Sequence, residues 1–454
     1  MSGEMPVLAD LDRIMQSELT AYLACRPGSA KLAAERGRGF VKGVPLHWMT
    51  DWPQPFPMVI DTAMGNQLRD IDGNQVTDFC LGDTAAMFGH APAPLMRALS
   101  ARAEGGLSYM LPSRDVQPVG ALLVERFGLP CWQIACTASD ANRFAIRAAR
   151  AATGRDTIVV FDGCYHGTVE DTLVDLIDGT TLPRRSLLGE PRNRSISTVA
   201  IPFNDEEALE SALAGRDVAC VIAEPVMTNS GMILPQPGFL ERMRQMTRAT
   251  GTLLIIDETH TISSGPGGYA KAIGLPPDLF VVGKPVAGGV PTAVWGMTQE
   301  VSDALFAARP ADEHGHSGIG TTLSGNALQL ACLRAVLEEI MVPATYAKMI
   351  SAAEALEAGI ETLIGRFGLP WHVARVGARL EIVFSRLPLR NAAESRNAAN
   401  DRVQALMHIA LLNRGYLLTP FHNMMLVSPD TTEPQVRGFL AAFRQVLELL
   451  TGRE

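Results

Sequence analysis

The stretch TLLIID, residues 252–257, is an apolar run that ends on an acid, and the stretch LFVVGK, residues 279–284, is a second run that ends on a lysine. Short runs of Leu, Ile and Val without alternation are typical of parallel strands that are covered on both faces. In open α/β sheets the carboxyl ends of such strands face the ligand crevice. We therefore expect Asp257 and Lys284 to point at one site.

The two charged residues suggest a particular chemistry. A carboxylate that can keep a pyridine nitrogen protonated, together with a lysine that can form an imine, is the minimal apparatus for pyridoxal phosphate chemistry. The alternative is a salt bridge at the rim of a sheet, because charged residues are common at strand ends. The two residues alone leave both interpretations open.

Length and charge exclude several classes of protein. A chain of 454 residues is too long for one small core, and α/β enzymes of this size often have one large and one smaller domain. The net charge of −9 argues against a nucleic-acid-binding protein, which needs a basic face. No stretch approaches roughly 18 consecutive apolar residues, so we expect no membrane-spanning segment.

The N-terminus and the cysteines indicate the compartment. Acids at positions 4, 10 and 12 leave no uncharged apolar block for a signal peptide. The seven cysteines are odd in number and include no C-x-x-C pair, so we expect reduced core residues rather than disulfides or metal ligands. Both observations predict a cytoplasmic protein without a metal site.

The hydrophobic pattern divides the chain into three regions. Residues 1–70 contain an amphipathic helix and an irregular segment, and we assign them to a small domain. Residues 71–326 alternate strand-like runs with helical stretches, which predicts a large α/β domain with a mostly parallel sheet. Residues 327–454 are mainly helical and complete the small α+β domain. Residues 176–198 carry Gly, Pro, Ser and several arginines without a period, so we expect an exposed loop there.

Three further segments carry candidate binding residues. Thr137, Ala138 and Ser139 precede a helical stretch, where free backbone N–H groups suit a phosphate, although a simple N-cap fits as well. Tyr165 and His166 follow an apolar run, where a packed tyrosine and a structural histidine are the alternative. Residues 320–326 again place hydroxyls and glycines before a helix, which suits a phosphate or a cap equally well.

In their order along the chain, these segments resemble the class III, or subgroup II, aminotransferases of pyridoxal-phosphate fold type I. They are most similar to the branch of glutamate-1-semialdehyde aminomutase and the β-amino-acid or D-phenylglycine aminotransferases. The resemblance covers nearly the whole chain and rests on Asp70-x-Asp72-Gly73, Gly89-His90-Ala91-Pro92, Tyr165-His166-Gly167, Glu224-Pro225, Asp257-Glu258, Gly283-Lys284 and Thr322-x-Ser324-Gly325-Asn326. It implies a large domain with a mostly parallel seven-stranded sheet flanked by helices, plus a smaller domain from both chain ends.

The resemblance also implies roles for individual residues. Lys284 would form the Schiff base with pyridoxal 5′-phosphate and move the substrate proton, while Asp257 would keep the pyridine nitrogen protonated. Tyr165 would stack on the ring, and Thr259, two residues beyond Asp257 on the same strand face, would cover its other side. The other implied cofactor-binding residues are Thr137, Ala138, Ser139, His166, Glu224 and, in a homodimer with shared active sites, Thr322 of the partner subunit.

The expected substrate pocket departs from the family pattern. The places where relatives often hold a carboxylate with an arginine read His47-Trp48-Met49 and Phe421 here. Either Trp48 and Phe421 line a partly apolar pocket, or a loop arginine such as Arg184 or Arg185 binds the anion; core packing is the competing explanation for the two aromatics. His260, beside Thr259, is a candidate substrate contact or extra acid or base, with a satisfied strand-end histidine as the alternative.

These expectations together predict a pyridoxal-phosphate-dependent aminotransferase that moves an amino group between a small-molecule amine or amino acid and a carbonyl acceptor. An aminomutase, racemase or ammonia-lyase on the same scaffold is the alternative, because all of them begin with loss of the Cα proton to Lys284. A cofactor-binding sensor without turnover is disfavoured, since Lys284 and Asp257 are both present. The sequence does not distinguish among the enzyme reactions.

Overall fold

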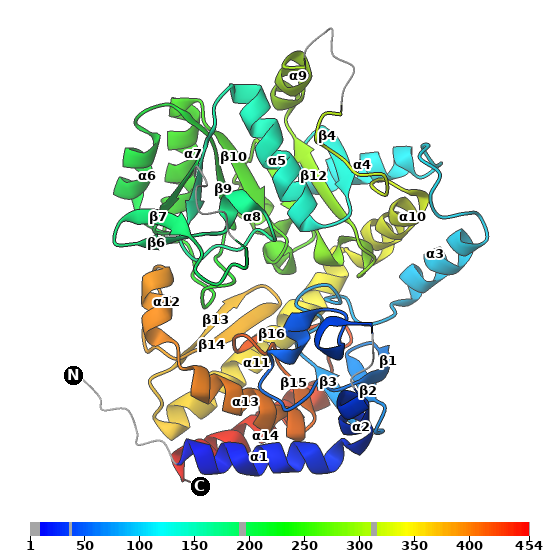
Figure 1. The fold of residues 1–454 in the computed structure, drawn as a ribbon, viewed down its shortest axis with the longest axis vertical. Coiled ribbons are helices and arrows are strands. Elements are labelled where there is room, and N and C mark those ends of the chain that lie inside the picture. Colours follow the sequence, from blue (N-terminus) through cyan, green and yellow to red (C-terminus); the bar gives the residue numbers. More distant parts are fainter. Residues whose placement is uncertain (1–9, 36–38, 190–196, 310–315, 454) are drawn as a thin grey trace. The chain divides into compact units, whose positions relative to one another are not determined.

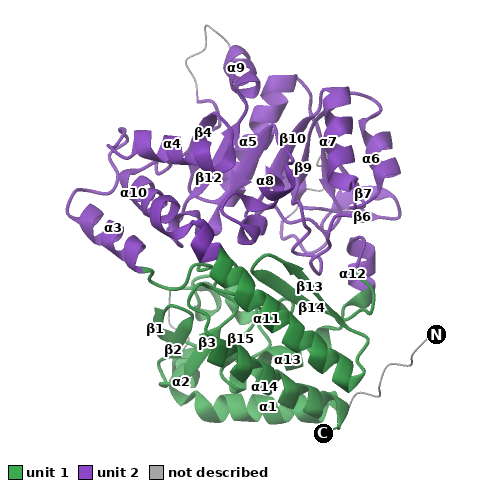
Figure 2. Ribbon diagram, turned by 180° about the vertical axis from the view of Figure 1, so that it is seen from behind, with its two compact units in different colours: residues 1–92, 347–388, 398–454 green, residues 93–346, 389–397 purple. Residues whose placement is uncertain are grey.

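A computed structural model describes residues 10–35, 39–189, 197–309 and 316–453 (Figure 1). The chain divides into two units, which Figure 2 colours separately. Unit 1 comprises residues 1–92, 347–388 and 398–454, and unit 2 comprises residues 93–346 and 389–397. Within the described residues, no helix is both long enough and apolar enough to cross a membrane.

The boundaries of the units differ from the predicted ones, which followed residues 70 and 326. Strand β3 (Gln75–Asp78) joins unit 1 because it pairs in parallel with β15 (Tyr416–Leu417) near the C-terminus. Helix α10 (Ala327–Ala335) joins unit 2, where it packs against α3 (Ala93–Ala103) and α4 (Val116–Phe127). Pairing partners distant in the sequence, rather than local composition, determine where each boundary falls.

Unit 2 is built on a seven-stranded, mostly parallel sheet, which confirms the predicted architecture. Its strands are, in spatial order, β4 (Cys131–Ala135), β12 (Ala293–Met297), β11 (Leu279–Val282), β10 (Leu253–Asp257), β9 (Val218–Ala223), β5 (Thr157–Phe161) and β8 (Thr198–Ile201). Strand β12 runs antiparallel to both of its neighbours. Strands β9 and β11 are buried along their whole length, as expected for central strands that read as continuous apolar runs.

Helices complete unit 2 around this sheet. Helix α5 crosses the sheet and packs against β4, β9, β10, β11 and β12. The helices that complete the unit are α5 (Ala138–Thr153), α6 (Glu206–Leu213), α7 (Phe239–Thr250), α8 (Gly268–Ile273), α9 (Gln299–Ala307) and α12 (Ala392–Ala398). Alanines fill the buried face of α5, so its backbone can approach the strands closely.

The register of the central strands brings their carboxyl ends to one level. The paired residues are Val159 with Val221, Ala223 with Ile256, and Asp257 with Val281. The four strands β5, β9, β10 and β11 are parallel to one another, so the residues that follow them leave the sheet along one edge. This edge carries Tyr165, Glu224, Asp257 and Lys284.

The segment 176–198 is not the plain loop that we expected. Strand β6 (Val174–Ile177) pairs with β7 (Thr180–Pro183) as an antiparallel hairpin, and residues 190–196 lie outside the described part. The turn at Asp178 and Gly179 has positive φ at both residues, which suits a tight two-residue hairpin. Arg184, after the hairpin, pairs with Asp175 at 3.2 Å and donates to the carbonyl of Cys164 at 3.0 Å.

Unit 1 combines two small sheets with helices. The sheets have the orders β1 (Ile60–Met64), β2 (Gln67–Asp70), β3, β15, and β13 (His372–Val376), β14 (Arg379–Val383), β16 (Met424–Leu426). The helices are α1 (Leu11–Cys25), α2 (Pro27–Glu35), α11 (Pro343–Phe367), α13 (Asp401–Asn413) and α14 (Glu433–Thr451), with the first residues of α11 in unit 2. Buried apolar side chains from α1, α11, α13, α14 and both sheets share one core, and Ala30 and Ala33 of α2 pack against it.

The sheet of unit 2 should tolerate no side chain at Gly296 in β12. A Cβ there would lie 2.8 Å from three ring atoms of Trp132 on β4, so Gly296→Ala should destabilise the protein by about 1–3 kcal/mol. The matched control is Gly120→Ala in helix α4, where a Cβ meets nothing within 4 Å and should stabilise the helix by about 0.5–1 kcal/mol. Thermal unfolding measures both, and equal melting temperatures would contradict the packing described here.

Candidate active site

Asp257 is held at the strand-end edge by three neighbouring residues. Its Oδ2 accepts a hydrogen bond from the Asn142 side chain at 2.7 Å and lies 2.9 Å from Nδ1 of His166, while its Oδ1 accepts from the Thr259 backbone at 3.0 Å. All four residues are buried. Asn142 and His166 come from α5 and from the segment after β5, so three separate elements converge on one carboxylate.

The carboxylate of Asp257 is ionised. Burial by itself raises the pKa of this acid, but the hydrogen bond and charge of His166 and the hydrogen bonds from Thr259 lower it to about 2. Burial also disfavours a charged imidazole, yet the neighbouring Cys164 and Asp257 hold the pKa of His166 well above its ordinary value. Asp257 is therefore an ionised carboxylate that its donors hold in place at the end of β10.

The prediction for Thr259 rested on strand alternation, and that reasoning is wrong. Strand β10 ends at Asp257, and Thr259 lies in the turn that follows. Its position comes from its backbone N–H, which donates to the acid two residues earlier. Whether its side chain covers a bound ring remains a prediction.

Lys284 follows β11 in a strained backbone conformation. Its φ is +49°, a left-handed value that is uncommon outside glycine, and Pro285 comes next in the short helical turn Lys284–Ala287. Strain of this kind persists only where the surrounding structure imposes it, and it is often found at functional sites. The Lys284 amine makes a hydrogen bond with Nε2 of His260, so the structure brings these two predicted residues together.

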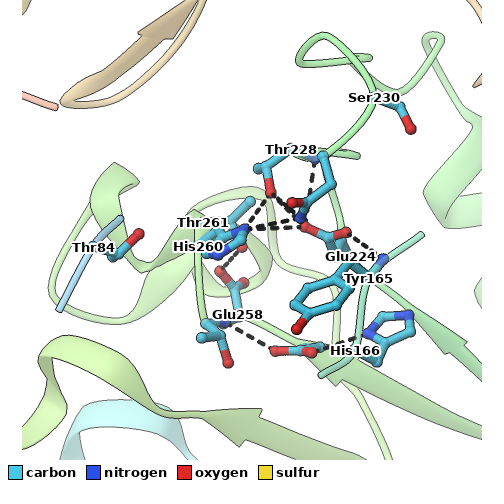
Figure 3. A network of polar contacts seen from close by, with 12 residues as sticks. Thr84, Tyr165, His166, Glu224, Thr228, Ser230, Glu258, His260 and Thr261 are labelled. Carbon is cyan, nitrogen blue, oxygen red and sulfur yellow. Dashed lines mark hydrogen bonds and ion pairs between the residues drawn. The ribbon is translucent and has the colours of Figure 1, made fainter. Parts of the chain in front are cut away.

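Behind His260 lies a second buried carboxylate. Thr228 stands between His260 and Glu224, with its hydroxyl oxygen 2.5 Å from Nδ1 of His260 and 2.6 Å from Oε2 of Glu224 (Figure 3). Glu224 also lies 3.7 Å from the imidazole directly. On its other side, its Oε1 faces the backbone N–H of Tyr165 at 3.5 Å. Glu224 therefore orders the residues around Lys284 and the backbone of Tyr165.

The start of helix α5 forms a small cradle of backbone and hydroxyl groups. The Thr137 hydroxyl accepts from the N–H of Asp140, and the Ser139 hydroxyl accepts from the N–H of Thr168 at 3.0 Å. A Cβ on Gly283 would lie 2.9 Å from the Cβ of Ala138, and a Cβ on Gly167 would clash with Ser139. Because these two residues are glycines, the chain at positions 167 and 283 can approach the first turn of α5 closely.

The other predicted residues fall in different places. Tyr165 is 40% exposed beside the site, and Thr322 lies exposed in a turn before α10. His47, Trp48 and Met49 form a short helical turn in unit 1. The Trp48 ring meets the ring of Phe421, also in unit 1, edge-on at 6.2 Å between centroids. The two rings are therefore neighbours with exposed surface, and whether they line a substrate pocket remains a prediction.

Sequence reasoning missed two residues of the site. Asn142 is the one amide on the buried, alanine-rich face of α5, and this isolated polar group was a usable signal. Thr228 lies in an irregular segment four residues after Glu224, and nothing in its sequence context marks it. Both residues act by holding a carboxylate or an imidazole rather than by facing the open side of the site.

Comparison with known proteins gives a consistent result. The family model of the class-III aminotransferases matches residues 48–424. A glutamate-1-semialdehyde 2,1-aminomutase from Thermomicrobium roseum is 34% identical over 369 residues, which cover 80% of this chain and 84% of that protein. Among the described residues, no group of three or more His, Cys, Asp or Glu side chains is placed to hold a metal ion.

Solved structures extend the similarity to the whole fold. A glutamate-1-semialdehyde aminomutase from Pseudomonas aeruginosa is 45% identical with a TM-score of 0.94, over 97% of this chain and 98% of that one. A variant aminomutase from the same organism, 44% identical, has been solved in complex with PMP. An omega-transaminase from Sphaerobacter thermophilus is 28% identical with a TM-score of 0.84, over 94% of this chain and 99% of that one. The chain belongs to the class-III aminotransferases, which are pyridoxal 5′-phosphate-dependent enzymes of fold type I.

Proposed function

We propose that this chain is an aminotransferase that moves an amino group between an amine or amino acid and a carbonyl acceptor, with Lys284 as the residue that binds the cofactor covalently. The observation that carries the proposal is the convergence of an ionised, buried Asp257 and a strained Lys284 at the ends of neighbouring parallel strands. A simple rim salt bridge accounts for neither the strain nor the partners, because Asp257 is held by His166 and Asn142 instead.

The residues of the site fit pyridoxal 5′-phosphate. Asp257 offers a fixed anion to a protonated ring nitrogen, and its buried donors keep it ionised. The cradle at the start of α5 offers backbone N–H groups and the positive end of a helix to a phosphate. The positions of Gly283 and Gly167 support this assignment, because a Cβ at either one would crowd the first turn of that helix.

Each residue then has a defined task. Bound pyridoxal phosphate supplies a carbonyl that condenses with amines and a ring that withdraws electrons from the substrate Cα. Lys284 holds the cofactor and moves the proton at Cα. Asp257 would keep the ring nitrogen protonated, and Tyr165 and Thr259 would cover the two faces of the ring. Thr137, Ala138 and Ser139 bind the phosphate, joined in a homodimer by Thr322 of the partner subunit.

The substrate is expected to have an apolar body. Trp48 and Phe421 form an aromatic pair with exposed surface, and the places around them supply no arginine for a carboxylate. Arg184 is already paired with Asp175, which argues against its serving as a free carboxylate receptor. A buried carboxylate without a charged partner costs several kcal/mol, so simple α-amino acids such as alanine should be poor substrates.

A second candidate is intramolecular amino transfer, as in an aminomutase. It is supported by the names of the relatives, since a protein 45% identical over 97% of this chain is called a glutamate-1-semialdehyde aminomutase. Racemisation or ammonia loss would use the same lysine and acid. The reactions differ in the fate of nitrogen, because an aminotransferase passes it to another carbon skeleton, whereas a mutase returns it to the same one.

Lys284 should be essential for this transfer. With a panel of ¹⁵N-labelled amines and amino acids and unlabelled 2-oxo acids, the wild-type protein should place the label on the acceptor, as detected by mass spectrometry. Lys284→Ala should abolish transfer without unfolding the chain, and Lys271→Ala, which removes an amine bonded to the carbonyls of Glu125 and Arg126, should not. A labelled isomer of the donor, formed without acceptor, would instead identify a mutase.

Asp257→Asn should lower kcat by about 100-fold or more, because a neutral amide cannot hold a proton on the ring nitrogen. The matched control is Asp162→Asn, since Asp162 also follows a strand but pairs with Arg396 and with the backbone of Leu176. Its kcat should stay within a few-fold of wild type. Near-normal kcat in Asp257→Asn would reduce Asp257 to a structural strand-end residue.

Trp48→Ala should lower kcat/KM for the preferred apolar substrate by about 10 to 200-fold, the range for losing one apolar contact in a pocket. Phe306→Ala, which removes an exposed aromatic ring from α9, serves as the control and should leave kcat/KM unchanged. Efficient turnover of alanine or glutamate that is insensitive to Trp48→Ala but lost in Arg184→Ala or Arg185→Ala would show that a loop arginine, and not the aromatic pair, recognises the substrate.

A further inference from the structure

Four buried or partly buried side chains form a continuous line of hydrogen bonds that starts at the reactive amine. Lys284 contacts Nε2 of His260, Nδ1 of His260 lies 2.5 Å from the Thr228 hydroxyl, and that hydroxyl lies 2.6 Å from Oε2 of Glu224. His260, Thr228 and Glu224 are buried, with Thr228 completely enclosed. The proposed roles of Lys284 in holding the cofactor and moving the Cα proton do not require Thr228 and Glu224 behind His260.

The donors in this line have one consistent direction. The Thr228 hydroxyl donates to Oε2 of Glu224 at 2.6 Å, and this bond uses the one proton that the hydroxyl has. The 2.5 Å contact between Thr228 and His260 then needs its proton from the imidazole, which makes Nδ1 the protonated nitrogen. Nε2 is then the unprotonated nitrogen, and its lone pair accepts from the Lys284 amine.

One neighbour bears on this tautomer. The Asn229 amide lies 3.3 Å from Nδ1 of His260, a longer contact than the one from Thr228. The same amide nitrogen donates to the Thr228 hydroxyl oxygen at 3.4 Å, so its hydrogens have an acceptor other than Nδ1. The shorter contact, in line with the carboxylate, therefore decides the tautomer.

We propose that His260 is a catalytic residue that takes a proton from the Lys284 ammonium group, and that Thr228 and Glu224 are positioning residues that fix its tautomer and receive the proton at the far end. The N–H bond of Lys284 breaks as a proton joins Nε2, the Nδ1 proton passes to the Thr228 oxygen, and the original hydroxyl proton passes to Glu224. The products are a neutral amine and a neutral carboxylic acid, with imidazole and hydroxyl unchanged in charge. The return of the proton reverses each step.

This relay rests on the proposed role of Lys284 and gives His260 a task beside it. An amine must be unprotonated to attack a carbonyl or to take a proton from carbon. His260 and Thr228 connect the Lys284 amine to the carboxylate of Glu224, so a proton can leave the amine without a water molecule. The relay thus prepares the amine on each cycle without opening the site.

Trace labelling of amines tests the relay without turnover. The full chain, freed of cofactor, is treated at neutral pH with a small amount of acetic anhydride, and modification of Lys284 is measured by mass spectrometry relative to Lys271 in the same sample. Thr228→Val, which keeps the shape but lacks the hydroxyl, should slow the relative labelling of Lys284 by about two- to tenfold. Thr228→Ser, which restores the hydroxyl, should recover it. Equal or faster labelling in Thr228→Val would overturn the proposal.

The tautomer gives a second, independent readout. In protein with ¹⁵N-labelled histidine, the signal of His260 is identified by its loss in His260→Gln, and it should show a protonated Nδ1 and an unprotonated Nε2. Thr228→Val should change this pattern, and Thr228→Ser should keep it. Protonation at Nε2 in the wild-type protein would also overturn the relay.

Borohydride reduction of the holoenzyme distinguishes a failure of the relay from a failure of the proposed role of Lys284. If the reduced cofactor is found on Lys284 while Thr228→Val labels normally, the relay fails and the proposed function stands. If the cofactor is found on another lysine, the proposed role of Lys284 fails, and the relay fails with it because it no longer serves the reactive amine. If the Thr228→Val protein folds poorly, Glu224→Gln takes its place. This change replaces the carboxylate at the end of the line by a neutral amide and should slow the labelling of Lys284 in the same way.

Discussion

The parallel register of β5, β9, β10 and β11 is the constraint on which the site depends. It brings the ends of four strands to one level, so residues separated by more than a hundred positions in the sequence leave the sheet along the same edge. The strands are held by burial on both faces, and a shift of one residue in any of them would move its terminal side chain away from the others. The sheet therefore fixes the positions of the residues that follow these strands.

Two buried carboxylates at this edge have different partners and hence different tasks. Asp257 is held by an imidazole, an amide and a backbone N–H, which keep it ionised and fixed in place. Glu224 instead ends a line of exchangeable hydrogens that leads to the Lys284 amine. The two acids differ in task because their neighbours differ: Asp257 keeps its negative charge, whereas Glu224 is placed to accept a proton in the proposed relay.

Much of the fold and the central pair of the site could be predicted from the sequence, because both follow from local patterns. Apolar runs without alternation predicted the strands. The runs at residues 252–257 and 279–284 end on Asp257 and Lys284. Thr228 could not be predicted, since only the fold brings it between His260 and Glu224. The hairpin at β6 and β7 was missed because its short strands carry no apolar run, and Thr259 was placed by an alternation that ends with the strand at Asp257.

The unit boundaries show the same limit, since β3 and α10 are assigned by partners far away in the sequence. The central claim, that the edge formed by these strand ends holds pyridoxal 5′-phosphate between Lys284 and Asp257, is tested most directly by a crystal structure of the protein grown with the cofactor. The account predicts continuous density between the Lys284 side chain and the cofactor, with the Asp257 carboxylate within hydrogen-bonding distance of the ring nitrogen. Density for the cofactor on another lysine, or a ring nitrogen that faces no carboxylate, would contradict it.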